Sequence, residues 1–314
     1  MATTTTTSDV RLSALPPASG HAGLRGVIAS EFTKIRSVRS TYWTILALFV
    51  VSVGIATLIG FGITSTIHSQ PWQAPGTDAT QAILTPFLFI GQLIIAVIGA
   101  MVITSEYSTG MIRTSLTAMP RRGTVYLGKL IVITSCTLVV SLVTSFLAFF
   151  AGSLTLSGSH IGGSLFHNVT IPASVNMSPG PKGPDSPPNY HFVGTLTITP
   201  AHVLTAIIGS ALFVTVAALI AFGLGAIIRH TAGAITSAIG LLFVLSIIIQ
   251  ILPDTWRWDI MRFFPDAAGR VISTTLPGQQ NPHLWSTWPQ FLVTVVWAVV
   301  LVGVGGYLFR KRDA

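Results

Sequence analysis

Residues 203–228 read VLTAIIGSALFVTVAALIAFGLGAII, a run without a single charged side chain. A helix rises about 1.5 Å per residue, and about 20 apolar residues are enough to cross the ~30 Å hydrocarbon core of a bilayer. The run therefore predicts a transmembrane helix, Val203–Ile228.

Five further stretches have the same character, so we expect six transmembrane helices. None of the six contains Asp or Glu, and Lys129 is the only basic residue inside any of them. The other five stretches are Tyr42–Ile63, Ile83–Thr104, Val125–Thr155, Ala232–Leu252 and Gln290–Phe309. The pattern predicts an all-α polytopic membrane protein.

The composition of the whole chain excludes the common alternatives. Only 8% of the 314 residues are charged and 50% are hydrophobic, whereas ordinary soluble domains carry about 25% charged residues. A disordered chain needs low hydrophobicity and high charge, so it is excluded as well. The single cysteine, Cys136, forbids an intramolecular disulfide or a cysteine-based zinc cluster. We expect no metal and no other cofactor.

Basic residues divide unevenly between the two sides of the expected helices. Six spans place both termini on one side, where most of the 17 Lys and Arg residues lie. The four on the other side are Lys182, Arg257, Arg262 and Arg270. Because cytoplasmic loops are enriched in Lys and Arg, both termini are predicted to be cytoplasmic. The charge is spread over segments next to the membrane, which favours lipid head groups over a nucleic-acid partner.

The segment before the first span divides at residue 24. Residues 1–23 are rich in Thr, Ser, Ala and Pro, lack the apolar run of a signal peptide, and predict a disordered cytoplasmic tail. In residues 24–41 apolar side chains recur at helical spacing, which predicts an amphipathic helix lying on the membrane surface. The alternative is the basic flank of the first span. The residues expected at the membrane interface are Phe32, Lys34, Arg36 and Arg39.

The polar connection between the second and third spans, residues 105–123, is short. Ser108 or Thr109 is placed to cap a helix over about Met111–Ala118, and Pro120 would end it. Such a helix would offer a soluble partner a docking surface, and the alternative is an ordinary loop with cytoplasmic arginines. Glu106 is expected at the end of the span, next to water.

No ATP site of its own is expected in this chain. Residues 123–129 match G-x4-G-K but lack the Ser or Thr that must follow, and a membrane span comes next.

Two segments are predicted on the opposite side of the membrane. Residues 157–201 are rich in Gly, Pro and Ser and predict a flexible extracytoplasmic loop. Residues 253–289 include aromatic side chains interleaved with Arg and Asp, a composition typical of the head-group level. They predict a short helix that re-enters the outer leaflet or lies on it, with Trp256, Trp258, Phe263 and Phe264 at the interface.

Over residues 24–314 the chain resembles the permease subunits of ABC-2-type ABC transporters of the kind abundant in actinobacteria. The most specific stretch is EYSTGMIRT at 106–114, followed by PRRG at 120–123 and Lys129. Supporting stretches are SEFTKIRSVRSTYW at 30–43 and the basic end FRKRDA at 309–314. The loop at 157–201 departs from the family in being long and rich in proline.

The resemblance implies an architecture and partners. It implies six spans, an interfacial N-terminal helix, a cytoplasmic coupling helix and short extracytoplasmic helices before the last span. Two permease subunits, identical or different, would pair with two ATP-binding subunits in the bacterial plasma membrane and export a substrate. The coupling role carries over to Glu106, Tyr107, Thr109, Gly110, Met111, Ile112, Arg113 and Thr114.

Three other classes of function are weighed against this expectation. A membrane sensor or immunity-type protein would use residues 157–201 to recognise a ligand without transport. An ATP-independent secondary transporter would often show internal repeats and interrupted helices, and no clear repeat is visible. A membrane enzyme would need a catalytic motif such as H-E-x-x-H or G-x-S-x-G, and the sequence has neither.

Overall fold

The computed structural model describes residues 23–70, 78–112, 121–156, 162–178, 189–276 and 283–311. The predicted tail thus lies outside the described residues, apart from Gly23. Within the described ranges, six helices are long and apolar enough to cross a membrane, and each overlaps one predicted stretch. The all-α polytopic architecture is therefore confirmed. The six are α2 (Arg39–Ser69), α3 to α4 (Ala79–Ser108), α6 (Arg122–Thr155), α7 (Pro200–Ile228), α8 to α9 (Thr231–Ile249) and α12 (Thr287–Lys311).

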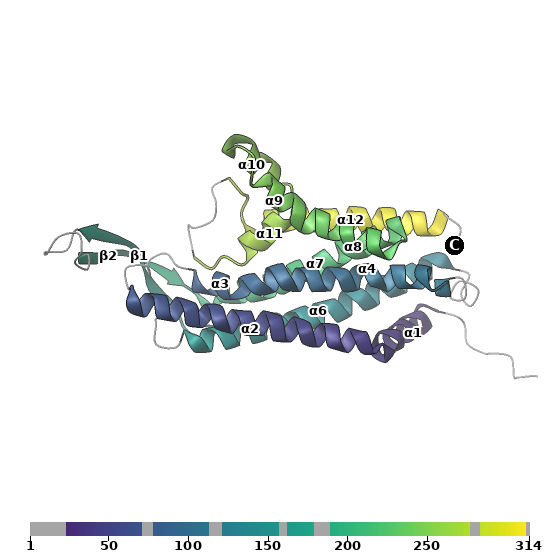
Figure 1. Ribbon diagram of the computed structural model, residues 1–314, viewed down its shortest axis with the longest axis horizontal. Coiled ribbons are helices and arrows are strands. Elements are labelled where there is room, and N and C mark those ends of the chain that lie inside the picture. Colours follow the sequence, from purple (N-terminus) through teal and green to yellow (C-terminus); the bar gives the residue numbers. More distant parts are fainter. Residues whose placement is uncertain are drawn as a thin grey trace, which may run out of the picture.

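The helices form an elongated bundle with two distinct ends (Figure 1). One end carries α1 (Leu24–Ser37) and the last turn of α12, and it is called the α1 end below. The other end carries two antiparallel strands and the short helices α10 (Asp254–Met261) and α11 (Pro265–Ile272), and it is called the hairpin end. The beginning and the end of the described chain therefore lie on the same side.

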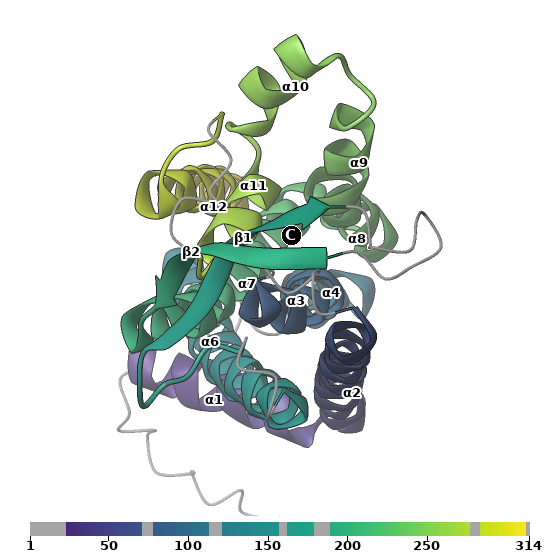
Figure 2. The same cartoon turned by 90° about the vertical axis from the view of Figure 1, so that its left-hand side faces the viewer.

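Helix α7 is the centre of the bundle, surrounded by α4, α6 and α12 (Figure 2). Small residues let the backbones approach closely, as is common between membrane helices. A Cβ atom built on Gly99 of α4 would lie 2.3 Å from the carbonyl oxygen of Ala218 on α7. On another side of α7, a Cβ atom on Gly223 would lie 2.6 Å from the carbonyl carbon of Leu301 on α12. Glycine is therefore required at both contacts.

Two of the spans are interrupted by a short π-helix. In the second span, η2 (Phe87–Gly91) separates α3 (Ala79–Pro86) from α4 (Gln92–Ser108). Pro86 explains the irregularity, because proline has no N–H to donate to the preceding turn. In the fifth span, η3 (Gly240–Val244) separates α8 (Thr231–Ile239) from α9 (Leu245–Ile249). The two π-helices touch through Phe89 and Phe243, whose ring centroids lie 5.9 Å apart.

The loop at 157–201, predicted to be flexible, contains a β-hairpin. Strands β1 (Val169–Ser178) and β2 (Asn189–Ile198) pair antiparallel, with Val169 opposite Ile198 at the base. Ile171 and Ile198 are buried against α3 and α7, so the base of the hairpin is anchored in the bundle. The proline-rich residues 179–188 lie outside the described residues. Alternating apolar residues at the base of the hairpin are the sequence pattern that could have predicted the strands. The Gly and Pro residues around them favoured the prediction of a flexible loop instead.

Asp78 ties the start of the second span to the segment after α11. One carboxylate oxygen, Oδ1, accepts hydrogen bonds from the backbone N–H of Gln81 at 2.9 Å and from the hydroxyl of Thr275 at 2.7 Å. The other, Oδ2, accepts from the backbone N–H groups of Thr275 at 2.6 Å and Leu276 at 3.2 Å. Asp78 is therefore both the N-cap of α3 and a clamp on the hairpin end.

Two short helices, α10 and α11, precede α12. Trp256 and Phe263 are exposed, whereas Trp258 and Phe264 are half-buried. Helix α11 packs into the bundle, since a Cβ atom on Gly269 would meet the ring of Phe213 on α7. In the described part of this segment, α10 remains available to lie on a membrane surface, which stays our prediction for its aromatic residues.

Candidate functional site

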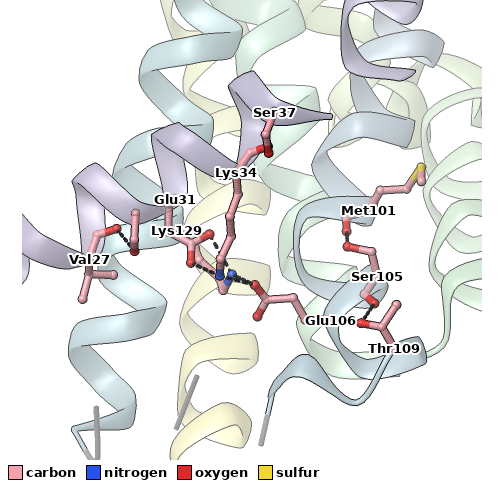
Figure 3. A network of polar contacts seen from close by, with 10 residues as sticks. Val27, Glu31, Lys34, Ser37, Met101, Ser105, Glu106, Thr109 and Lys129 are labelled. Atoms are coloured by element: carbon pink, nitrogen blue, oxygen red, sulfur yellow. Dashed lines mark hydrogen bonds and ion pairs between the residues drawn. The ribbon is translucent and has the colours of Figure 1, made fainter. Parts of the chain in front are cut away.

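Four charged side chains from three helices meet inside the α1 end (Figure 3). The ammonium nitrogen of Lys129, Nζ, lies 2.8 Å from Oε2 of Glu31 and 2.6 Å from Oε1 of Glu106. The Nζ atom of Lys34 lies 2.9 Å from Oε1 of Glu31 and 2.9 Å from Oε1 of Glu106. These four residues are called the ion-pair cluster. They join α1, α4 and α6.

The packing of α1 across α6 explains how the cluster forms. Gly128 has no side chain, and a Cβ atom there would lie 2.4 Å from a methyl group of Val27. Helix α1 therefore approaches α6 closely at this point. Glu31 follows Val27 by one helical turn and shares its buried face. Lys129, the neighbour of Gly128, is then within reach of the Glu31 carboxylate.

Burial makes the balance of charge in the cluster important. The side chain of Lys129 is only 1% exposed, and a buried unpaired charge is costly by several kcal/mol. Two carboxylates and two ammonium groups give no net charge, and each lysine contacts both glutamates. Oε2 of Glu106 is buried and has no hydrogen-bond partner among the described residues. The cluster is therefore neutral as a whole and sensitive to the loss of any one member.

Lys34 is the half-exposed member of the cluster, on α1 and outside the spans. Burial by itself disfavours the charged ammonium, but the hydrogen bonds and charges of Glu106 and Glu31 outweigh it and raise the pKa of Lys34. Lys34 is therefore protonated at neutral pH.

A second set of contacts joins the end of α4 to α7 and α12. Arg229, which ends α7 in the left-handed conformation with φ 59°, places its guanidinium 5.0 Å from the ring centre of Tyr107. Its Nη2 donates to the backbone oxygen of Leu308 on α12 at 3.3 Å. Tyr107 follows Glu106 directly, so two successive residues at the end of α4 contact α1, α6 and the end of α7, and Arg229 continues the contacts to α12.

Of the residues predicted to couple to a partner, some are exposed, some are buried and two lie outside the described residues. Thr109, Gly110 and Met111 are exposed, and Gly110 has a φ of 71° that favours glycine. Ile112 is buried and Tyr107 is half-buried in one apolar cluster. Arg113 and Thr114, like most of the predicted helix at 111–118, lie outside the described residues.

The expectation that Glu106 stands next to water was wrong. Its side chain is 7% exposed and is held by Lys34 and Lys129. The helix continues beyond Thr104, where the apolar stretch ends, and this extension carries Glu106 into the bundle.

Three of the four residues of α1 and its surroundings that were predicted at the membrane interface are exposed, and one is only half-exposed. Phe32 is 53% exposed and Arg36 and Arg39 are exposed, as an interfacial position requires. Lys34 differs, because its ammonium points into the cluster rather than to lipid head groups. The face of α1 that meets the bundle carries Val27 and Glu31.

Sequence reasoning missed the roles of Glu31 and Lys129. The available signal was that Lys129 is the only basic residue in a predicted span, because such a residue nearly always has a partner. In the part of the chain that the structure describes, no three His, Cys, Asp or Glu side chains form a metal-binding group. The observed contacts at the α1 end join α1, α4 and α6 through ion pairs.

Six spans and a charged junction at one end define a polytopic membrane protein. Residues 27–174 match the family model described as ABC-2 family transporter protein, and the match begins in α1 and ends in β1. The match covers just under half of the chain and supports an ABC-2-type membrane permease of an ABC transporter. All members of the ion-pair cluster lie within the matched range. A comparison with the curated proteins found no match.

Proposed function

We propose that this chain is the membrane subunit of an ATP-driven exporter in the bacterial cytoplasmic membrane. Two permease subunits would form the pathway, and a separate ATP-binding subunit would hydrolyse ATP on the α1 side, where both termini would be cytoplasmic. The observation that carries the proposal is the junction at the end of α4. The exposed residues Thr109–Met111 come one residue after Glu106 and Tyr107, which contact α1, α6 and the end of α7.

The junction suggests how movement of a partner would reach the spans. A partner pressing on Met111 would displace the end of α4. Glu106 would pass the displacement to α6 through Lys129 and to α1 through Lys34. Tyr107 would pass it to α7 through Arg229. One contact surface would then shift most of the bundle, as a switch in the access of a pathway requires.

Replacement of Met111 by Asp tests this route. Met111 is 46% exposed, so the variant should insert and fold while presenting a charge to the docked partner. We expect co-purification with its ATP-binding subunit to fall at least about tenfold, which corresponds to about 1.4 kcal/mol. Phe166→Asp is the matched control, since Phe166 is 86% exposed at the hairpin end. Equal recovery of the ATP-binding subunit with both variants would contradict the proposed docking segment.

The β-hairpin favours one other candidate function, the recognition of an extracytoplasmic ligand without transport. A hairpin anchored by Ile171 and Ile198 could present residues beyond the membrane surface. The same co-purification separates the two candidates, because a sensor of this kind needs no ATP-binding subunit. Recovery of a stable complex with wild type would favour the exporter.

A further inference from the structure

A groove of about 400 Å³ lies beside the ion-pair cluster, between α1, α2, α4 and α6. Near α1 its lining is polar and includes Lys34, Ser40 and Thr41. Farther from α1 the lining is apolar and includes Ile45, Ile98 and Val140. The groove is therefore amphipathic along its length, with one charged end and one apolar end.

The length of the groove matches one leaflet of a bilayer. Its lining on α4 runs from Glu106 to Ile95, eleven residues apart. At about 1.5 Å per residue this is roughly 16 Å, about half of a ~30 Å hydrocarbon core. Helix α2 packs along α6 and barely touches α4, which leaves the groove open to the membrane between α2 and α4. An acyl chain in the leaflet on the α1 side could enter it sideways.

The polar end of the groove offers donors to an anion. The Lys34 side chain is 37% exposed and uses two N–H groups on Glu31 and Glu106, so one of the three N–H groups of its ammonium remains. Helix α2 starts at this point without a side-chain cap, and Ser40 and Thr41 of its first turn line the groove. The N–H of Thr41 donates to the carbonyl oxygen of Val38 at 3.1 Å. The first N–H groups of a helix have no partner further along it, and they attract negative charge.

Charge around the groove selects the type of lipid. The ion-pair cluster is neutral, but Arg36 and Arg39 are exposed on either side of the bend at Val38. They add positive charge at the level of the head groups, which attracts anionic lipid. A zwitterionic head group would also place its cationic group near these arginines, so its electrostatic attraction to them would be weaker than that of an anionic head group.

We propose that this groove binds an anionic phospholipid of the leaflet on the α1 side. Its phosphate meets Lys34 and the start of α2, and one acyl chain follows Ile45, Ile98 and Val140 toward the middle of the bilayer. Thr109 and Met111, which we assign to the partner, also line the groove, whereas the proposed contacts of the phosphate are Lys34 and the start of α2. It requires that the chain lies in a membrane, and it does not depend on ATP-driven export.

The native cysteine reports on the occupancy of the groove. Cys136 is the only cysteine in the sequence, is half-buried and lines the groove. The full chain is purified in a neutral detergent, and the rate of Cys136 alkylation by N-ethylmaleimide is measured while lysolipid is added. Oleoyl lysophosphatidylglycerol is compared with oleoyl lysophosphatidylcholine, which has the same chain and a zwitterionic head.

We expect the anionic lysolipid to slow alkylation in a saturable way. Its half-saturating mole fraction in the micelle should be at least about fivefold lower than that of the choline lysolipid, which corresponds to about 1 kcal/mol. Equal half-saturation for the two lysolipids, or no protection by either, would overturn the proposal.

Two matched substitutions locate the head group. Lys34→Gln should abolish the preference for the anionic lysolipid. Arg25→Gln removes the same charge from an exposed position of the same helix that does not line the groove, and it should keep the preference. A preference that survives Lys34→Gln in a monodisperse variant would refute the assignment of the phosphate to Lys34. If Lys34→Gln does not fold, the comparison of the two lysolipids on wild type decides.

Discussion

Replacement of Lys129 by Met tests whether the ion-pair cluster holds the α1 end together. Met is about as long as Lys and carries no charge, so the change removes the ammonium while keeping most of the volume. Glu31 and Glu106 would then share only Lys34, which is half-exposed. The buried cluster would carry one uncompensated negative charge.

The magnitude follows from the burial of the partners. Both glutamate side chains are 7% exposed, so neither can recover its lost contact from water without a rearrangement. Breaking a buried ion pair by removing one partner costs roughly 3–5 kcal/mol. Adding Glu106→Gln to Lys129→Met removes the unpaired charge again. The double variant should therefore be more stable than Lys129→Met alone, by about 1–3 kcal/mol.

Thermal stability in detergent, read as the fraction that stays monodisperse after heating, ranks the variants. The expected order is wild type, then the double variant, then Lys129→Met. Lys311→Met is the control, since Lys311 is exposed at the end of α12, and it should behave like wild type. A Lys129→Met variant as stable as wild type would refute the reasoning, as would a double variant that is less stable than Lys129→Met.

Four further expectations follow from other contacts. Gly99→Ala should destabilise the protein by about 1–3 kcal/mol or more, because the added Cβ meets the backbone of α7. Gly54→Ala is the control: a Cβ atom there has nothing within 4 Å, so this variant should be slightly more stable than wild type when both are heated in detergent. Asp78→Ala should cost at least about 2 kcal/mol, since it removes an N-cap and leaves buried N–H groups without an acceptor; a melting curve like that of wild type would contradict the clamp. The pKa of Lys34 is raised above 10.5, so the contribution of Lys34 to stability is complete below that pH and is lost as the pH rises through the folded-state pKa. In that pH range wild type should lose more stability than Lys34→Gln. Parallel stability curves for the two proteins would exclude this contribution of Lys34. With Cys136 replaced by Ser, an impermeant maleimide applied to intact cells should label Phe166→Cys and spare Met111→Cys, and the reverse pattern would invert the proposed orientation.

The spans were predictable because their signal is local and strong. A helix that crosses a membrane must place about 20 apolar residues in succession, and each of the six does so. The ends were less predictable, since helices continue past the hydrocarbon core. The second span extends to Ser108, beyond the predicted end at Thr104, and Glu106 enters the bundle only because of this extension.

The ion-pair cluster was not predictable because its members lie far apart in the sequence. Lys129 bonds Glu31 across 98 positions and Glu106 across 23 positions. No periodicity within one helix indicates such a contact. The sequence did mark Lys129 as exceptional, but only the packing of Val27 on Gly128 identifies Glu31 as its partner.

The positions of the cluster residues in the chain set the order in which their charges arrive during synthesis. Glu31 and Glu106 both precede Lys129, so both carboxylates leave the ribosome before the lysine must enter the membrane. A lysine at the centre of a membrane helix costs about 2.5–3.5 kcal/mol on insertion, and less toward a helix end. When the third span emerges, both possible partners of its lysine have therefore already been synthesised. The packing of this span against α1 and α4 then closes the cluster.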